Sequence, residues 1–303
     1  MTNQLQNIPI KSAGKPPAIL APAADLFLRR AARFDQLADG HTLGDWLRYL
    51  GALSRAQHDA LGALPDLPVP DAAALARARE HHMPPLPAQS WPRDTAWHQA
   101  LRSIAAALLP AAPNPARADL ARIATLPADQ LETLAERVLH TELYGDDAAL
   151  LPYIGAALQV LWTGLAQRVA PSLTQLDVPG VCPCCGFLPV ASLVQTVKET
   201  ANLRYLHCAL CNTEWNLVRV KCAACDSTEG VAYRELAGDA VRQPGAVRAE
   251  TCDSCKSYLK IVYQEKGGVD PVADDLATLA IDILVDEAGY SRAGPNLLLV
   301  PGG

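Results

Sequence analysis

Four Cys-x-x-Cys pairs in the C-terminal half constrain this 303-residue chain more than any other feature of its sequence. A spacing of two residues lets the chain turn so that both sulfurs face one ion, while backbone N–H groups in the turn hydrogen-bond the thiolates. Two such pairs, here called knuckles, complete a tetrahedral four-thiolate site. The sequence therefore predicts two metal centres with these ligands: Cys182, Cys185, Cys208, Cys211, Cys222, Cys225, Cys252 and Cys255.

The order of the knuckles leaves their pairing open, because four knuckles combine two at a time in three ways. The stretches between the first and second knuckles and between the third and fourth are long enough for a hairpin or two, whereas the shorter middle stretch suits a linking strand. We therefore favour two tandem modules, in which the first knuckle pairs with the second and the third with the fourth. An interleaved cross-brace is the alternative.

A disulfide scaffold is the other interpretation of paired cysteines, and two observations disfavour it. Half of the residues are hydrophobic, so a chain of this length can bury a core without cross-links. Residues 1–27 lack the continuous apolar run of a secretory signal, because Pro and Lys interrupt it. We expect a cytoplasmic protein, and disulfides do not persist in that reducing compartment.

Tetrahedral thiolates suit both zinc and iron, so the ligands leave the metal open. The first knuckle, Cys182-Pro-Cys-Cys185-Gly, resembles the C-P-x-C-G turn of rubredoxins, although zinc ribbons use the same turn. Cys184 occupies the x position, and we expect a spare thiol that points away from the metal. We expect His207 to lie at the surface or to support a ligand, and Trp215 to shield the cluster from water.

The first 180 residues contain no cysteine and predict an all-α domain, because apolar residues recur at helical spacing between proline-rich breaks. The expected helices cover residues 23–38, a segment that follows an N-cap at Thr42, and residues 95–109, 115–124, 128–139 and 148–169. Residues 148–166 carry no charge and are long enough to span a membrane. Pro152, Gly155 and Gln159 make a poor span, so we expect a buried helix and no membrane insertion.

The residue pattern changes after the Pro-Gly step at residues 179–180. Beyond it, short runs rich in Val, Tyr and Leu predict strands. These runs cover residues 190–197, 203–207, 214–220, 231–236 and 258–264. A last amphipathic helix is predicted over residues 271–287, with this apolar face: Leu276, Leu279, Ala280, Ile283 and Leu284.

The expected fold class is therefore α+β. An all-α helical domain covers residues 1–180, and two tandem four-cysteine β modules, similar to rubredoxins or zinc ribbons, cover residues 181–220 and 221–303. The second module ends in the C-terminal helix.

With their flanking residues, the knuckles resemble the FdhE family of formate dehydrogenase accessory proteins. The segments that carry this resemblance are CPCCGFLPVAS, LRYLHCALCNTEWNLVRVKCAAC, ETCDSCKSYLK and DPVADDLATLAIDILVDEAGYSRAG. The resemblance implies that the eight cysteines hold two iron ions, with zinc as the alternative. It also implies a cytoplasmic maturation factor that binds the catalytic subunit of formate dehydrogenase before export and has no turnover of its own.

Two other functions stay open from the residues alone. Tandem zinc ribbons commonly bind nucleic acid, but the region from Val181 onward carries 11 basic and 15 acidic residues, and this net negative charge disfavours phosphate binding. We therefore expect no nucleic-acid partner. A thiol oxidoreductase would need a metal-free Cys-x-x-Cys pair, and an electron carrier would use the iron itself.

Overall fold

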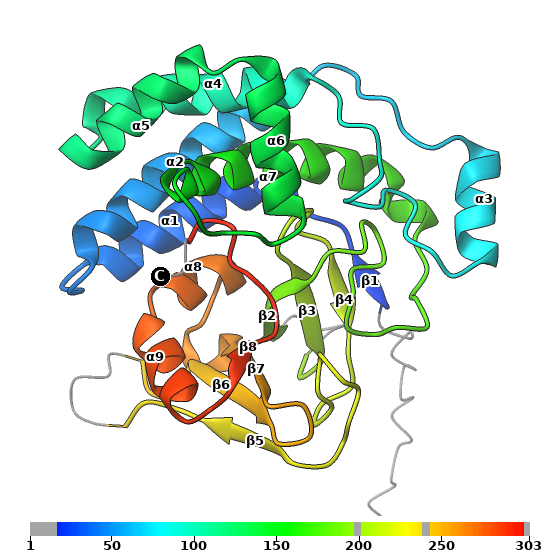
Figure 1. Ribbon diagram of the computed structural model, residues 1–303. Coiled ribbons are helices and arrows are strands. Elements are labelled where there is room, and N and C mark those ends of the chain that lie inside the picture. Colours follow the sequence, from blue (N-terminus) through cyan, green and yellow to red (C-terminus); the bar gives the residue numbers. More distant parts are fainter. Residues whose placement is uncertain (1–16, 197–200, 238–242, 300–303) are drawn as a thin grey trace, which may run out of the picture.

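The N-terminal helices form where apolar residues recur every three to four positions. The computed structural model describes residues 17–196, 201–237 and 243–299. The helices of its N-terminal part are α1 (Leu26–Ala38), α2 (Gly44–Gly62), α3 (Ala72–Glu80), α4 (Ala96–Leu108), α5 (Asn114–Thr125), α6 (Ala128–Leu139) and α7 (Leu151–Val169). They form the upper layer in Figure 1, where α3 stands apart from the others. The sheet lies beneath this layer.

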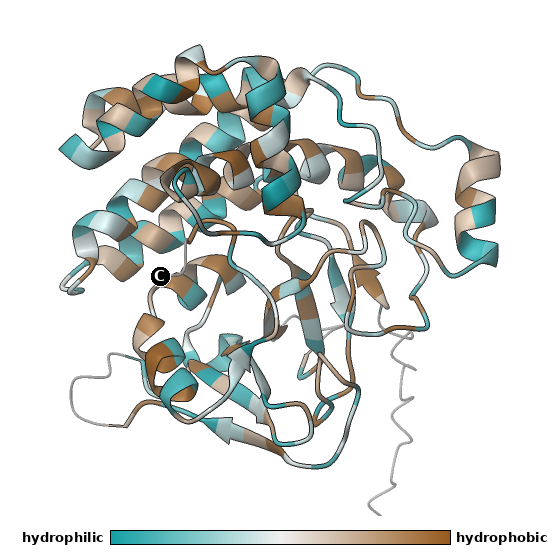
Figure 2. Cartoon of the chain, in the orientation of Figure 1, coloured by the Kyte–Doolittle hydropathy of each residue, from teal (hydrophilic) through white to brown (hydrophobic). Residues whose placement is uncertain are grey.

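Helix α7 lies at the centre of this layer and packs against α2, α4 and α6. Apolar residues predominate along it (Figure 2). Within the described residues, one helical stretch, Ala148–Ser172, is long and apolar enough to cross a membrane. Its most apolar window is 78% buried inside the protein, so the structure places it in the core, as the sequence predicts.

Two features of the helical layer differ from the sequence-based expectation. Helix α2 has Leu43 at its N-cap position and no side-chain cap, so the predicted cap at Thr42 is wrong. The backbone N–H of Leu43 instead donates to Nδ1 of His41 over 3.0 Å. Helix α3 was not predicted, because none of its residues is buried and no apolar stripe marks it.

One mixed sheet holds the strands of both cysteine modules. Its strands are β1 (Ile19–Leu20), β2 (Pro189–Val194), β3 (Arg204–Cys208), β4 (Glu214–Asn216), β5 (Val231–Arg234), β6 (Val247–Cys252), β7 (Ser257–Tyr263) and β8 (Ser291–Arg292). They lie in the order β1-β4-β3-β2-β7-β6-β5, and β8 also pairs with β7. The parallel pair β2–β7 joins the two modules, so their strands form one surface beneath the helices.

The predicted strands are present, but some are shorter than expected. The strand predicted over residues 190–197 ends at Val194, and Val197 lies outside the described residues. The strand predicted over residues 214–220 ends at Asn216. Strand β6 was not predicted, because Arg248 and Glu250 interrupt its apolar pattern. The two-residue strands β1 and β8 carry no pattern that a sequence could reveal.

The last predicted helix is broken in two, which corrects the expectation of one continuous helix. Helix α8 (Pro271–Leu276) and helix α9 (Leu279–Glu287) meet at a break after Ala277. Nζ of the buried Lys260 donates to the backbone carbonyls of Asp275 (2.8 Å) and Thr278 (3.0 Å). These carbonyls are therefore satisfied without a continuing helix.

The break also changes which side chains of the last helix are buried. Ile283 and Leu284, which were predicted to face the core, are 60% and 54% exposed. Ile281 and Val285 are buried instead. The helical spacing of residues 271–287 was therefore misleading, because it does not continue in phase through the break.

Candidate metal centres

All four knuckles share one backbone feature, a left-handed conformation directly after the second cysteine. The residues in this position have φ angles of 71°, 56°, 64° and 54°, in the order Gly186, Asn212, Asp226 and Lys256. Gly, Asn and Asp accept this conformation more readily than other residues, so three of the four knuckles carry a suitable residue there. The tight turns also aim backbone N–H groups at sulfur.

Three such N–H···S contacts are present, and one of them runs from the N–H of Leu210 to Sγ of Cys208 over 3.4 Å. The N–H of Cys211 donates to Sγ of Cys208, and that of Ala224 donates to Sγ of Cys222, each over 3.4 Å. Such donors spread the negative charge of a thiolate and favour its ionised form. The local geometry therefore matches the one that the two-residue spacing predicts.

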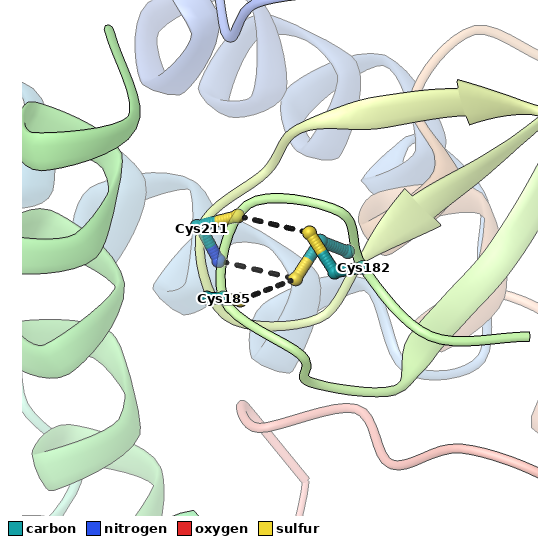
Figure 3. Close-up of side chains that lie close together, drawn as sticks. Cys182, Cys185 and Cys211 are labelled. Carbon is teal, nitrogen blue, oxygen red and sulfur yellow. Dashed lines mark hydrogen bonds between the residues drawn. The ribbon is translucent and has the colours of Figure 1, made fainter. Parts of the chain in front are cut away.

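Centre 1 is formed by the first and second knuckles: Cys182, Cys185, Cys208 and Cys211. Cys182 and Cys185 lie in the turn before β2, Cys208 ends β3, and Cys211 lies in the turn between β3 and β4. The Sγ–Sγ distance is 3.4 Å between Cys182 and Cys211 and 3.5 Å between Cys185 and Cys208. Figure 3 shows the side chains of Cys182 and Cys211 pointing toward each other.

Centre 2 is formed by the third and fourth knuckles: Cys222, Cys225, Cys252 and Cys255. Cys222 and Cys225 precede β5, Cys252 ends β6, and Cys255 lies in the turn before β7. The Sγ–Sγ distance is 3.7 Å both between Cys222 and Cys255 and between Cys225 and Cys252. The knuckles thus pair in tandem, and the interleaved alternative is not found.

The sulfur spacing fits a tetrahedral ion in both centres. A metal–sulfur bond of about 2.3 Å places the sulfurs of a regular tetrahedron about 3.8 Å apart. The closest pairs lie 3.4–3.7 Å apart, and all four sulfurs of each centre lie within 4.8 Å of one another. Both groups could therefore hold one metal ion each through four thiolates.

The two centres differ in burial. Each cysteine of centre 1 is at most 1% exposed and belongs to the main hydrophobic core. In centre 2, Cys225 and Cys255 are exposed, and only Cys222 and Cys252 are buried. Water can therefore reach two ligands of centre 2.

Segments of the helical part close around centre 1. The loop after α3 donates backbone hydrogen bonds to the first knuckle, from Leu86 to the carbonyl of Cys184 (3.0 Å) and from Ala88 to that of Cys185 (2.8 Å). Nε2 of Gln159 in α7 donates to the carbonyl of Ala209 in the second knuckle (2.8 Å). Centre 1 therefore lies between the helical layer and the sheet.

The pKa values of the buried thiols show how a cation would stabilise centre 1. Burial raises the pKa of the Cys182 and Cys185 thiols well above the ordinary value. Burial also acts to raise the pKa of Cys211, but hydrogen bonds from Cys182 and the neighbouring thiols hold it well below the ordinary value. A bound metal ion would replace the protons of these thiols.

Three residues singled out by the sequence lie close to centre 1. Cys184 is outside the four-sulfur group, as the sequence predicts, and interaction of its buried thiol with Cys211 raises its pKa well above the ordinary value. His207 is 1% exposed and does not lie at the surface, and its Nε2 lies 3.0 Å from Oδ1 of Asn212, the residue after the second knuckle. Trp215 is buried in the same core, and its indole N–H donates to the carbonyl of Pro179 (2.8 Å).

Sequence reasoning missed the residues that surround the second knuckle. Asn212 lies directly after Cys211, and its side chain contacts Arg30 in α1 and Thr163 in α7. An Asn that follows a knuckle is a usable signal for the left-handed turn. Nothing in the sequence links it to residues more than 40 positions upstream.

Comparison with known proteins extends these observations to a family. Three domain models match the chain: "FdhE, N-terminal" over residues 15–176, "FdhE, central domain" over residues 181–219, and "FdhE, C-terminal domain" over residues 220–299. A protein of Pseudomonas aeruginosa called "Protein FdhE homolog" is 40% identical over an alignment of 302 positions, which covers 96% of each chain. One of the same name from Cronobacter sakazakii is 37% identical, over 95% of this chain and 92% of its own.

A solved structure agrees with the sequence matches. The crystal structure of the FdhE protein from Pseudomonas aeruginosa superimposes with a TM-score of 0.80 at 38% identity, over 95% of this chain and 100% of the other. The fold and the site together define a helical protein whose sheet carries two four-cysteine clusters suited to metal binding. The chain belongs to the FdhE family, the accessory proteins of formate dehydrogenase.

Proposed function

We propose that this protein is a cytoplasmic maturation factor that binds the catalytic subunit of formate dehydrogenase before that subunit is exported. The observation that carries the proposal is membership of the FdhE family over nearly the whole chain, together with two closed four-cysteine centres. Four protein ligands leave a tetrahedral ion no open position for a substrate. The sequence also has no Gly-rich dinucleotide fingerprint, so the protein carries no turnover of its own.

We further propose that the eight cysteines of centres 1 and 2 are metal ligands and that the ions are iron, with zinc as the alternative. The first knuckle has the turn sequence of rubredoxins, and the sulfur spacing suits either ion. Iron held by four thiolates supplies one-electron redox chemistry, whereas zinc supplies only structural cross-linking. Metal analysis with an absorption spectrum on anaerobically purified protein distinguishes the two.

A second candidate function is electron transfer. The observation that favours it is the exposure of Cys225 and Cys255, which would let a redox partner approach the ion of centre 2. Nucleic-acid binding has no comparable support, because the region that carries both centres has a net negative charge. An iron ion in centre 2 that changes redox state with a partner would favour the electron carrier.

The test is a pull-down from an extract of cells that make formate dehydrogenase. The intact protein is the bait, and the Cys208→Ser and Cys252→Ser variants are compared with it. We expect the intact bait to retain the catalytic subunit, the variants to retain less, and a strain without the protein to lack formate dehydrogenase activity. Normal activity in that strain, with no subunit on the intact bait, would contradict the proposal.

A further inference from the structure

A single buried arginine of α1 contacts two segments of the C-terminal part that lie far apart in the sequence. Arg30 has no exposed surface. Its Nε donates to both carboxylate oxygens of Asp270, over 3.1 and 3.2 Å, and its Nη2 donates to Oδ1 of Asn212 over 2.9 Å. Asp270 is in turn the N-cap of α8 and accepts from the N–H groups of Val272 and Ala273. One guanidinium therefore holds the start of α8 and the residue after Cys211.

The side chain of Asn212 is fixed in orientation by this contact. Arginine can only donate, so the Asn212 atom that faces Arg30 must be the oxygen Oδ1. The same oxygen lies 3.0 Å from Nε2 of His207, and Nδ2 of Asn212 donates to the hydroxyl of Thr163 over 2.8 Å. The amide is thus held on both sides. Because Asn212 sits in the left-handed turn of the second knuckle, the clamp also fixes that turn.

The equivalent positions of the other knuckles are not held in this way. Gly186 has no side chain. Asp226 and Lys256 are exposed and pair with Lys221 and Asp253 of their own module, over 2.7 Å each, and Lys256 also lies over the ring of Tyr290 in that module. Within the described residues, a side-chain clamp from the helical layer onto the residue after a knuckle is therefore a feature of the second knuckle, whereas the first knuckle accepts backbone hydrogen bonds from the loop after α3.

We propose that Arg30 is a positioning residue for centre 1. Through Asn212 it holds the turn of Cys208 and Cys211 in the geometry that binds the ion, and through Asp270 it ties that turn to α8. The inference rests on the proposed metal-binding role of these cysteines. It implies that the ion of centre 1 and the contact between Arg30 and Asn212 stabilise each other, because coupling between two equilibria is reciprocal.

Arg33, one turn further along α1, is a matched control. It is 4% exposed and pairs with Asp274 in the same helix α8 over 2.5 Å. Its other hydrogen bonds go to Gly267 and Gln243, and neither residue lies in a knuckle. Arg33→Met therefore breaks a buried ion pair between α1 and α8 without disturbing Asn212.

The experiment measures zinc release to a coloured chelator. It uses the full-length Cys225→Ser Cys255→Ser protein loaded with Zn²⁺, so that the one ion left belongs to centre 1. We expect Arg30→Met to speed release about tenfold, as loss of an outer-shell partner does at other metal sites. Arg33→Met should leave the rate unchanged. Co²⁺ in place of zinc should show an altered absorption spectrum in Arg30→Met alone, which a general loss of stability would not produce.

Asn212→Gly keeps the proposal testable if Arg30→Met does not fold. Glycine accepts the φ of 56° at this position, so only the amide contacts are lost. We expect the same faster release and altered Co²⁺ spectrum. If Asn212→Gly shows normal release and a normal spectrum, or if the two arginine variants have equal effects, Arg30 is not a positioning residue. The metal-binding role of the cysteines would be unaffected by either result. A parent protein that holds no ion would overturn the metal-binding role as well.

Discussion

The two cysteine centres share the same local design and differ in everything around it. Each has one knuckle before a strand and one in a hairpin turn, and the left-handed residue after the second cysteine recurs in all four knuckles. Centre 1 is enclosed by α1, α7 and the loop after α3, whereas centre 2 lies in the outer part of the sheet with Cys225 and Cys255 exposed. The spacing of cysteines therefore determines ligand geometry, and packing determines accessibility.

This difference assigns the two centres different physical roles. An ion in centre 1 would cross-link segments that belong to one core, so its loss would affect the helical layer as well as the sheet. An ion in centre 2 would hold only the turns around β5, β6 and β7 and would stay within reach of solvent or a partner.

The largest effect is expected when one ligand of each centre is removed. Cys208→Ser should lose one ion and lower the free energy of unfolding by about 4 kcal/mol or more, because it leaves unpaired polar groups in the core. Cys225→Ser should also lose one ion but cost only about 1–2 kcal/mol, because water solvates the exposed site. Metal content and denaturant unfolding measure both. Equal losses of stability would mean that burial does not distinguish the centres.

A smaller effect is expected at Gly180, in the segment between the helical layer and the first knuckle, where the chain contacts the third knuckle of centre 2. A Cβ on Gly180 would lie 2.1 Å from the carbonyl oxygen of Ala223 in the third knuckle. Gly180→Ala should therefore displace that knuckle, cost about 2 kcal/mol and speed metal release from centre 2. Gly62→Ala is the control, since nothing lies within 4 Å of its added carbon. If Gly180→Ala is as stable as this control, the contact does not constrain centre 2.

The smallest effect concerns the reactivity of the thiols of centre 2 once its ion is removed. Burial raises the pKa of Cys222 to about 12. Burial also acts to raise the pKa of Cys255, but hydrogen bonds from Ser257, Cys225 and Cys222 together lower it to about 7. Because the thiolate is the nucleophile, alkylation of Cys255 should rise with pH, level off about one unit above this pKa, and exceed that of Cys222 about a hundredfold at pH 7.5. Mass spectrometry of protein from which only the ion of centre 2 has been removed measures the alkylation of both cysteines. Faster labelling of Cys222 would contradict the geometry of this centre.

The local parts of this structure could be predicted from the sequence, because each depends on residues close together in the chain. The helices around Trp97 and Trp162 follow the period of their apolar residues, and the cysteine turns follow from the two-residue spacing. The lengths of the intervening segments favoured the tandem pairing that the structure has, but they left the interleaved one open.

The parts that could not be predicted depend on contacts between distant segments. The sequence gives no sign that β2 pairs with β7, or that Arg30 meets Asp270 across 240 positions. The break between α8 and α9 depends on Lys260, which lies on another strand. The burial of centre 1 and the exposure of centre 2 could not be predicted either, because the knuckles of the two centres have similar sequences.

The most direct test of the account is the rate at which the wild-type protein, loaded with two Zn²⁺ ions, releases them to an excess of a coloured chelator. We predict two phases of one ion each, with the faster at least about tenfold ahead, because only local opening is needed at an exposed site. The fast phase should be missing in Cys225→Ser and the slow phase in Cys208→Ser. Release of both ions in a single phase, or loss of the slow phase in Cys225→Ser, would contradict the assignment of centre 1 as the enclosed site and centre 2 as the accessible one.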